Sequence, residues 1–103
     1  MVTSNPYDFF FGTLANKKRL EILQLLQKNG SLNVSRITSR LRLNQSTVSH
    51  SLKRLERCNF VSVRQRGKQR YYSLNQKTIL PLLKIIEEHV ENNCRKICCK
   101  KPR

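Results

Sequence analysis

Apolar side chains recur at helical spacing in three short segments, and asparagine or glycine residues separate each segment from the next. In the first segment, residues 15–28, the leucines and the isoleucine fall mostly on one stripe of a helix. Asn29 and Gly30 follow, and glycine readily adopts the left-handed conformation that ends a helix. The pattern therefore predicts an amphipathic helix that stops at Gly30.

Asparagine precedes each of the two later segments, residues 34–41 and 45–58, at a position where it can cap a helix. Asn33 and Asn44 are the expected N-caps, and a tight turn separates the two helices. Asn59 then tolerates the left-handed conformation of a helix end. A helix, a tight turn and a second helix in this order are typical of a helix-turn-helix.

Two alternating segments follow, residues 60–63 and 71–74, and such alternation is typical of strands. Residues 64–70 between them are expected to form a basic hairpin tip that turns at Gly67. A last helix is expected from Gln76 to about Asn93. It is apolar on more than one side, so one face covers the domain and another meets a partner.

A chain of 103 residues and 12.2 kDa has the length of one domain. We expect a single winged helix-turn-helix domain over residues 1–93 and a basic, cysteine-rich tail over residues 94–103. The predicted fold class is α+β and mainly α, with a two-stranded β wing and a C-terminal dimerisation helix. Because no apolar run reaches the ~20 residues of a membrane span and no secretion signal opens the chain, we expect no membrane partner and a cytoplasmic, nucleoid-associated location.

The net charge of +15 points to a polyanionic partner, because cationic surfaces release counterions from phosphates. Residues 16–75 alone carry fourteen Lys and Arg against Glu21 and Glu56, which gives +12. The charge therefore belongs to the folded part of the chain, and double-stranded DNA is the expected partner.

A helix that reads DNA buries one stripe in its own domain and offers short hydrogen-bonding side chains on the other. The N-terminal half of the 45–58 segment has this composition, and the hairpin tip adds four cations suited to phosphates or the minor groove. The residues predicted to contact DNA are Gln45, Ser46, Thr47, Ser49, His50, Lys53, Arg54, Arg64, Arg66, Lys68 and Arg70.

Other interpretations stay open at this point. The polar helix face can be ordinary solvated surface, and charge alone would serve a nonspecific or architectural nucleic-acid-binding protein. A protein-interaction module on a winged-helix scaffold is a third interpretation. An enzyme is not expected, because the sequence lacks paired carboxylates, a nucleophile with its base and a phosphate-cradling glycine loop.

Three stretches, residues 14–23 (LANKKRLEIL), 43–52 (LNQSTVSHSL) and 70–74 (RYYSL), resemble the ArsR, or ArsR/SmtB, winged-helix transcription regulators. The resemblance extends over about residues 12–90 and is most specific over residues 44–55. It implies a homodimer that binds an inverted-repeat operator, usually to repress, with helix 45–58 in the major groove. The resemblance implies that the terminal helices of the 1–93 domain form the dimer interface, which also accounts for an aromatic cluster that is costly to leave in water. The residues expected at that interface are Phe9, Phe10, Phe11, Leu82, Ile85, Ile86 and Val90.

The chain departs from the family at its metal sites. Many members sense metals through a Cys-x-Cys pair before the recognition helix, where this chain has Asn33 and Ser35, neither of which supplies a thiolate. The family's Asp and His site on the terminal helix is not supported either, because His89 is the only histidine there.

The remaining thiols crowd the C-terminus. Cys94, Cys98 and Cys99 lie among cations, and thiolates in such surroundings oxidise or bind soft metals. The alternatives are a redox switch in which oxidation links the tails of two subunits and changes operator binding, a metal or metalloid ion bound by these thiols with or without His89, a permanent disulfide between two subunits, and an incidental basic tail. No cofactor is required. Cys58 is instead expected as a core thiol.

Overall fold

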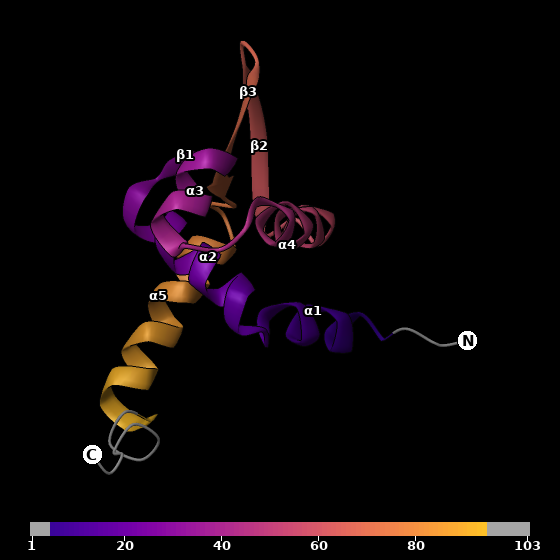
Figure 1. Ribbon diagram of the computed structural model, residues 1–103. Coiled ribbons are helices and arrows are strands. Elements are labelled where there is room, and N and C mark those ends of the chain that lie inside the picture. The colour runs from indigo at the N-terminus through magenta and orange to yellow at the C-terminus, as the bar shows by residue number, and fades with distance from the viewer. Residues whose placement is uncertain (1–4, 95–103) are drawn as a thin grey trace.

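The computed structural model describes residues 5–94, which form five α-helices, three strands and a short π-helix. The elements are α1 (Pro6–Leu14), α2 (Lys17–Asn29), β1 (Ser31–Asn33), α3 (Val34–Leu41), α4 (Gln45–Arg57), β2 (Val61–Arg66), β3 (Gln69–Leu74), α5 (Ile79–His89) and the π-helix Val90–Cys94. In Figure 1 the β2–β3 hairpin stands up from the helices, α1 runs out to one side beneath α4, and α5 runs down to the opposite end. The hairpin and α5 thus leave the helical body in opposite directions.

Asparagine side chains cap four of these helices at their N-termini, and in α1 the Asn5 Oδ1 atom accepts the Tyr7 N–H at 2.8 Å. The Oδ1 atoms of Asn16, Asn33 and Asn44 each accept the backbone N–H three residues further on, at 2.8–3.0 Å. Such a bond satisfies one of the donors that a helix leaves free at its start. Gly30 and Asn59 have positive φ angles of 88° and 60° at the ends of α2 and α4. The predicted caps at Asn33, Asn44, Gly30 and Asn59 are therefore confirmed.

The hydrophobic core lies where α2, α3 and α4 meet the sheet. The apolar side chains that are no more than 1% exposed are Ile22, Leu23, Leu26, Ile37, Val48, Leu52, Leu55, Phe60 and Val61. Tyr72 also faces the core, whereas Tyr71 is half-buried, as the alternation along this strand predicts. The expected core thiol, Cys58, is half-buried beside this cluster.

The sheet has three strands, where the sequence predicted only two. Its order is β1-β3-β2, both pairs are antiparallel, and Tyr72 lies opposite Leu32 on one side and Val63 on the other. β1 has three residues, too few for alternation to be recognised, and its partner strand lies far along the chain. Leu32 is buried, so β1 adds to the core and fixes the start of α3 against the base of the hairpin.

The hairpin is also longer, and its turn tighter, than the sequence indicated. The strands continue to Arg66 and Gln69, which lie opposite one another, and only Gly67 and Lys68 form the turn. Gly67 has a φ of 62°, which suits the first position of a two-residue type II′ turn. Most of the expected seven-residue tip is therefore paired strand.

Both terminal helices differ from the expectation. Residues 6–14 form a helix, which the resemblance implied but the residue pattern alone did not predict, with Pro6 in its first turn and Phe10 packed on Phe60, their ring centroids 5.0 Å apart. The last α-helix begins at Ile79 rather than Gln76, and residues 76–78 form a turn in which the Asn75 side chain accepts the N–H groups of Lys77 and Thr78. Within residues 5–94 no helix is long and apolar enough to cross a bilayer.

Candidate nucleic-acid interface

α4 buries one stripe and leaves a polar face in solvent. Val48, Ser51, Leu52 and Leu55 point into the protein. Of the predicted DNA-contact residues on this helix, Thr47 is half-buried. Five others are exposed, namely Gln45, Ser46, Ser49, His50 and Lys53. The polar side of α4 is thus free to meet another molecule along its N-terminal half.

The turn before α4 presents this face and adds a cation. Arg42 adopts a left-handed conformation with a φ of 57°, and it reverses the chain between α3 and the Asn44 cap. Arg42 is exposed, and so are Arg36 and Arg40 on α3. These three arginines were not among the predicted contact residues. In the sequence they lie four and two residues apart, just before the polar helix. This run of cations is the signal by which they could have been predicted to contact DNA.

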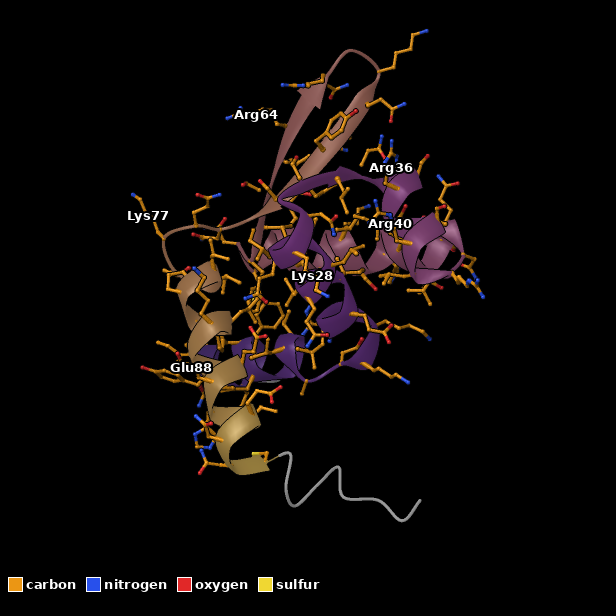
Figure 2. The ribbon with its side chains drawn as sticks, turned by 90° about the vertical axis from the view of Figure 1, so that its left-hand side faces the viewer. Lys28, Arg36, Arg40, Arg64, Lys77 and Glu88 are labelled. Carbon is orange, nitrogen blue, oxygen red and sulfur yellow. The ribbon has the colours of Figure 1, made fainter. Side chains whose placement is uncertain are left out.

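The register of the hairpin divides the cations of the wing between its two faces. Arg64 and Arg66 lie opposite Tyr71 and Gln69 on the face turned away from the core, and the Arg66 guanidinium carbon is 5.9 Å from the centre of the Tyr71 ring. Arg70 lies opposite Gln65, on the face that continues into the core. Figure 2 shows Arg64 on one side of the hairpin and Arg36 and Arg40 on the other. In the sequence the cations of the wing look like one patch, whereas the pleat of the strands places them on two faces of the hairpin.

Arg54 is placed differently from the sequence expectation. It was predicted to contact DNA, but its Nε atom donates a hydrogen bond to Thr13 Oγ1 at 2.9 Å, and its guanidinium carbon lies 4.5 Å from the centre of the Phe9 ring. The side chain is half-buried between α4 and α1. Its contacts are those of a packing residue rather than of a free cation on the polar face.

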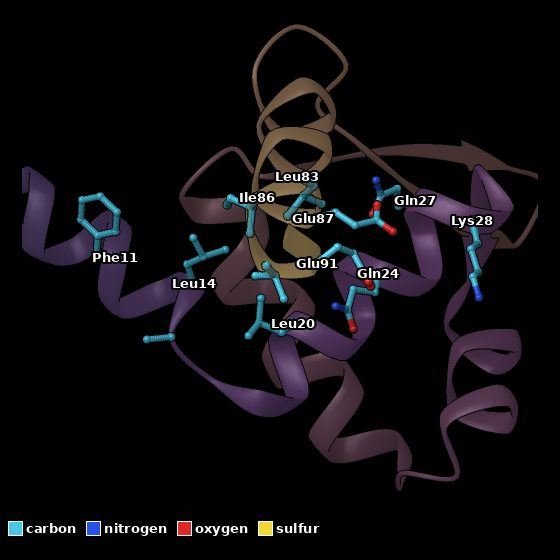
Figure 3. Close-up of a pocket in the computed structure, with 12 residues that line it drawn as sticks. Phe11, Leu14, Leu20, Gln24, Gln27, Lys28, Leu83, Ile86, Glu87 and Glu91 are labelled. Carbon is cyan, nitrogen blue, oxygen red and sulfur yellow. The ribbon is translucent and has the colours of Figure 1, made fainter. Parts of the chain in front are cut away.

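The three phenylalanines of α1 also have separate surroundings. Phe10 packs into its own subunit, and Phe9 lies beneath Arg54, while Phe11 is 60% exposed. Phe11 lines an apolar groove of about 750 Å³ between α1, α2 and α5, together with Leu14, Leu83, Ile86 and Val90 (Figure 3). Of the residues expected at a dimer interface, Ile85 is 63% exposed and Leu82 packs against the core.

Only part of the expected thiol site can be described. Cys94 is half-buried at the end of the π-helix, and Cys98 and Cys99 lie outside the described residues. His89 is exposed, and its Nδ1 atom lies 3.4 Å from the Asn93 amide. Among residues 5–94 no three His, Cys, Asp or Glu side chains come together as metal ligands. A metal or disulfide at the tail stays a prediction.

Comparison with known proteins agrees with this architecture. Residues 16–63 match the family model described as bacterial regulatory protein, arsR family. An uncharacterized HTH-type transcriptional regulator of Methanocaldococcus jannaschii is 32% identical over 78 residues, which cover 76% of this chain and 88% of the relative. The arsenical resistance operon repressor of Bacillus subtilis is 35% identical over 77 residues, covering 75% and 73%.

A solved structure gives the same result for the fold. The homodimeric winged helix-turn-helix DNA-binding domain of a Mycobacterium bovis protein superimposes with a TM-score of 0.81 at 25% identity, covering 90% of this chain and 85% of that one. The relatives are regulators and not enzymes. The chain therefore belongs to the arsR family of bacterial regulatory proteins and is a DNA-binding transcription regulator with a winged helix-turn-helix fold.

Proposed function

We propose that this chain acts as a homodimer that binds an inverted-repeat operator and represses transcription from it. The observation that carries the proposal is the exposed polar face of α4, backed by a fully buried stripe. Ser46 and Ser49 are small enough to let the helix enter the major groove, and the Gln45 amide can pair with an adenine edge. α4 is thus the proposed recognition helix.

Cations around α4 are proposed to hold the phosphate backbone. Lys53 continues the polar face, while Arg64, Arg66, Lys68 and Arg70 extend along the wing, and all five are exposed. In a helix-turn-helix the first helix crosses the backbone, which gives Arg36 and Arg40 on α3 the same role. Contacts of this kind fix the position of the protein on the duplex without reading its sequence.

The apolar groove is proposed to be covered by a second copy of the chain. A groove of about 750 Å³ lined by Leu14, Leu83, Ile86 and Val90, with Phe11 exposed at one end, is costly to leave in water. In Figure 3 the leucine and isoleucine side chains of α1, α2 and α5 converge on it. The M. bovis domain is homodimeric, and its fold covers most of this chain.

Repression is the proposed outcome of binding. The B. subtilis relative is named a repressor, and a dimer seated on an operator within a promoter excludes polymerase from the same DNA. A reporter gene under that promoter is expected to be expressed less when the chain is supplied. Increased expression would show that the chain activates instead.

Selection of tight-binding duplexes from random-sequence DNA tests the assignment of the reading helix. The unaltered protein is expected to recover one inverted repeat, whereas a nonspecific or architectural binder would recover none. Gln45→Ala and Ser49→Ala are expected to relax the preference at particular bases, each costing about 1–3 kcal/mol of binding free energy.

Substitutions in the wing provide the comparison. Arg66→Ala and Lys68→Ala are expected to weaken binding to all sequences alike and to flatten the dependence of affinity on salt. If the α4 variants and the wing variants changed binding in the same way, the assignment of base reading to α4 would be wrong.

A further inference from the structure

The C-terminal turn of α1 is held by arginine side chains from two other helices, at a contact we call the α1–α4 junction (Phe9, Thr13, Arg19 and Arg54). Thr13 lies at its centre and is 0% exposed. Its hydroxyl donates to the Phe9 carbonyl at 2.8 Å and accepts from Arg54 Nε at 2.9 Å. The single hydroxyl proton is used within α1, so the oxygen is left as an acceptor for the recognition helix.

Arg19 of α2 completes the junction from the other side. Its Nε and Nη2 atoms donate to the carbonyls of Thr13 at 2.7 Å and Gly12 at 3.0 Å, which have no N–H of the helix to accept from. Burial lowers the pKa of Arg19, and the positive charge of Arg54 lowers it further. Two like charges are therefore held close together by hydrogen bonds to α1, which fixes both guanidinium groups in place.

The junction connects the two surfaces to which the proposed function assigns different roles. α1 contributes Phe11 and Leu14 to the groove that the second copy would cover, and α4 carries the polar face. Arg54 and Thr13 link the side chains of these helices directly. Any change in the angle between α1 and α4 would move the two recognition helices of a dimer relative to one another.

We infer that Thr13 and Arg54 are positioning residues, which set the separation of the two recognition helices and so the half-site spacing that the dimer accepts. The inference rests on the proposed function. Half-site spacing on DNA follows from the geometry of the dimer, and a link that fixes that geometry selects among spacings. A direct contact of Arg54 with phosphate, as the sequence suggested, is the competing role.

The test uses Thr13→Val, which keeps the shape of the side chain and removes the hydroxyl, and Arg54→Met. Each protein is offered the inverted repeat recovered by selection, the same duplex with one half scrambled, and a pool with spacers of varied length. Both variants are expected to bind the intact repeat about tenfold more weakly and to recover a broader range of spacers. Their affinity for the duplex with one half scrambled is expected to equal that of the matching control, which is Thr38→Val for Thr13→Val and Arg57→Met for Arg54→Met.

Two controls separate the junction from general effects. Thr38→Val removes a hydroxyl that likewise donates to its own helix, at 2.7 Å, but accepts from no other helix in the contacts observed. Arg57→Met removes the same charge as Arg54→Met from an exposed position on α4. Neither control is expected to change the spacers recovered. The double variant Thr13→Val/Arg54→Met is expected to bind the intact repeat no more weakly than Arg54→Met alone.

Each contrary result overturns the inference in a recognisable way. If Thr13→Val selected the same spacer as the unaltered protein while Arg54→Met lost affinity for the single half, Arg54 would be a phosphate contact. If sedimentation showed the unaltered protein to be monomeric, the proposed dimer and the junction would both fail. A dimer whose spacers are unchanged in both variants would overturn the junction alone.

Discussion

Asn44 shows how much one short side chain determines in this fold. Its Oδ1 atom accepts the Thr47 N–H at 2.8 Å, at the point where the left-handed Arg42 has just reversed the chain. The side chain is exposed, so it contributes through this bond rather than through packing. The start of the recognition helix, and with it the direction of Gln45 and Ser46, depends on that cap.

Replacing Asn44 with alanine is expected to lower the free energy of unfolding by about 1 kcal/mol, because the N–H of Thr47 loses its acceptor. Urea unfolding followed by circular dichroism measures the change. Asn44→Ser keeps an acceptor at the cap and is expected to stay close to the unaltered protein. Equal losses in both variants would indicate that the asparagine acts by some means other than capping.

At the same scale, the sequence revealed which side of α4 is polar but not where one of its cations points. The buried Val48, Leu52 and Leu55 were predictable because a helix of 3.6 residues per turn places them on one stripe. Arg54 looked like its neighbours Lys53 and Arg57. Its partner, Thr13, lies 41 residues away in another helix, so no local pattern could reveal the contact.

Among the elements, those with local signals were predictable and those stabilised by distant partners were not. α2, α3 and α4 carry their caps and apolar stripes within their own sequence, and the β2–β3 hairpin carries its turn at Gly67. β1 exists through its pairing with β3. α1 is an exception, because the Asn5 cap and Pro6 at its start are local signals of a helix, while its packing on Phe60 and its bonds to two arginines attach it to the rest of the fold. Tertiary contacts of this kind leave little trace in a single sequence.

The attachment of α1 gives a prediction at this scale. Phe10→Ala is expected to lower the free energy of unfolding by about 2 kcal/mol, less than the 3–5 kcal/mol of a fully buried phenylalanine because Phe10 is half-buried. Chemical denaturation at several protein concentrations would measure it. Tyr7→Ala removes an aromatic ring that is 73% exposed on the same helix, and only a small change is expected. Comparable losses at both positions would contradict the idea that Phe10 is the anchor of α1.

At the scale of the whole molecule, the groove between α1, α2 and α5 is where the proposed second copy of the chain would bind. Ile86→Glu replaces an apolar side chain of the groove lining with a carboxylate, next to Glu87 and Glu91 that already line it, so a partner would have to cover additional like charge. Sedimentation equilibrium is expected to give twice the 12.2 kDa chain mass for the unaltered protein and the mass of one chain for this variant. Lys84→Glu introduces the same residue at an exposed position of α5 outside the groove lining, and it is expected to remain dimeric. A dimeric Ile86→Glu protein would place the interface elsewhere.

Coverage of that groove has a consequence for how the regulator responds to its own supply. If only paired chains bind an operator tightly, then while most chains are single the number of competent units grows with the square of the chain concentration. Where the operator is mostly unoccupied, halving synthesis would lower its occupancy to about a quarter rather than a half. The response of the regulated gene to the amount of this protein would then be steeper than linear, because only chains paired through the groove bind the operator tightly. No effector is required for this.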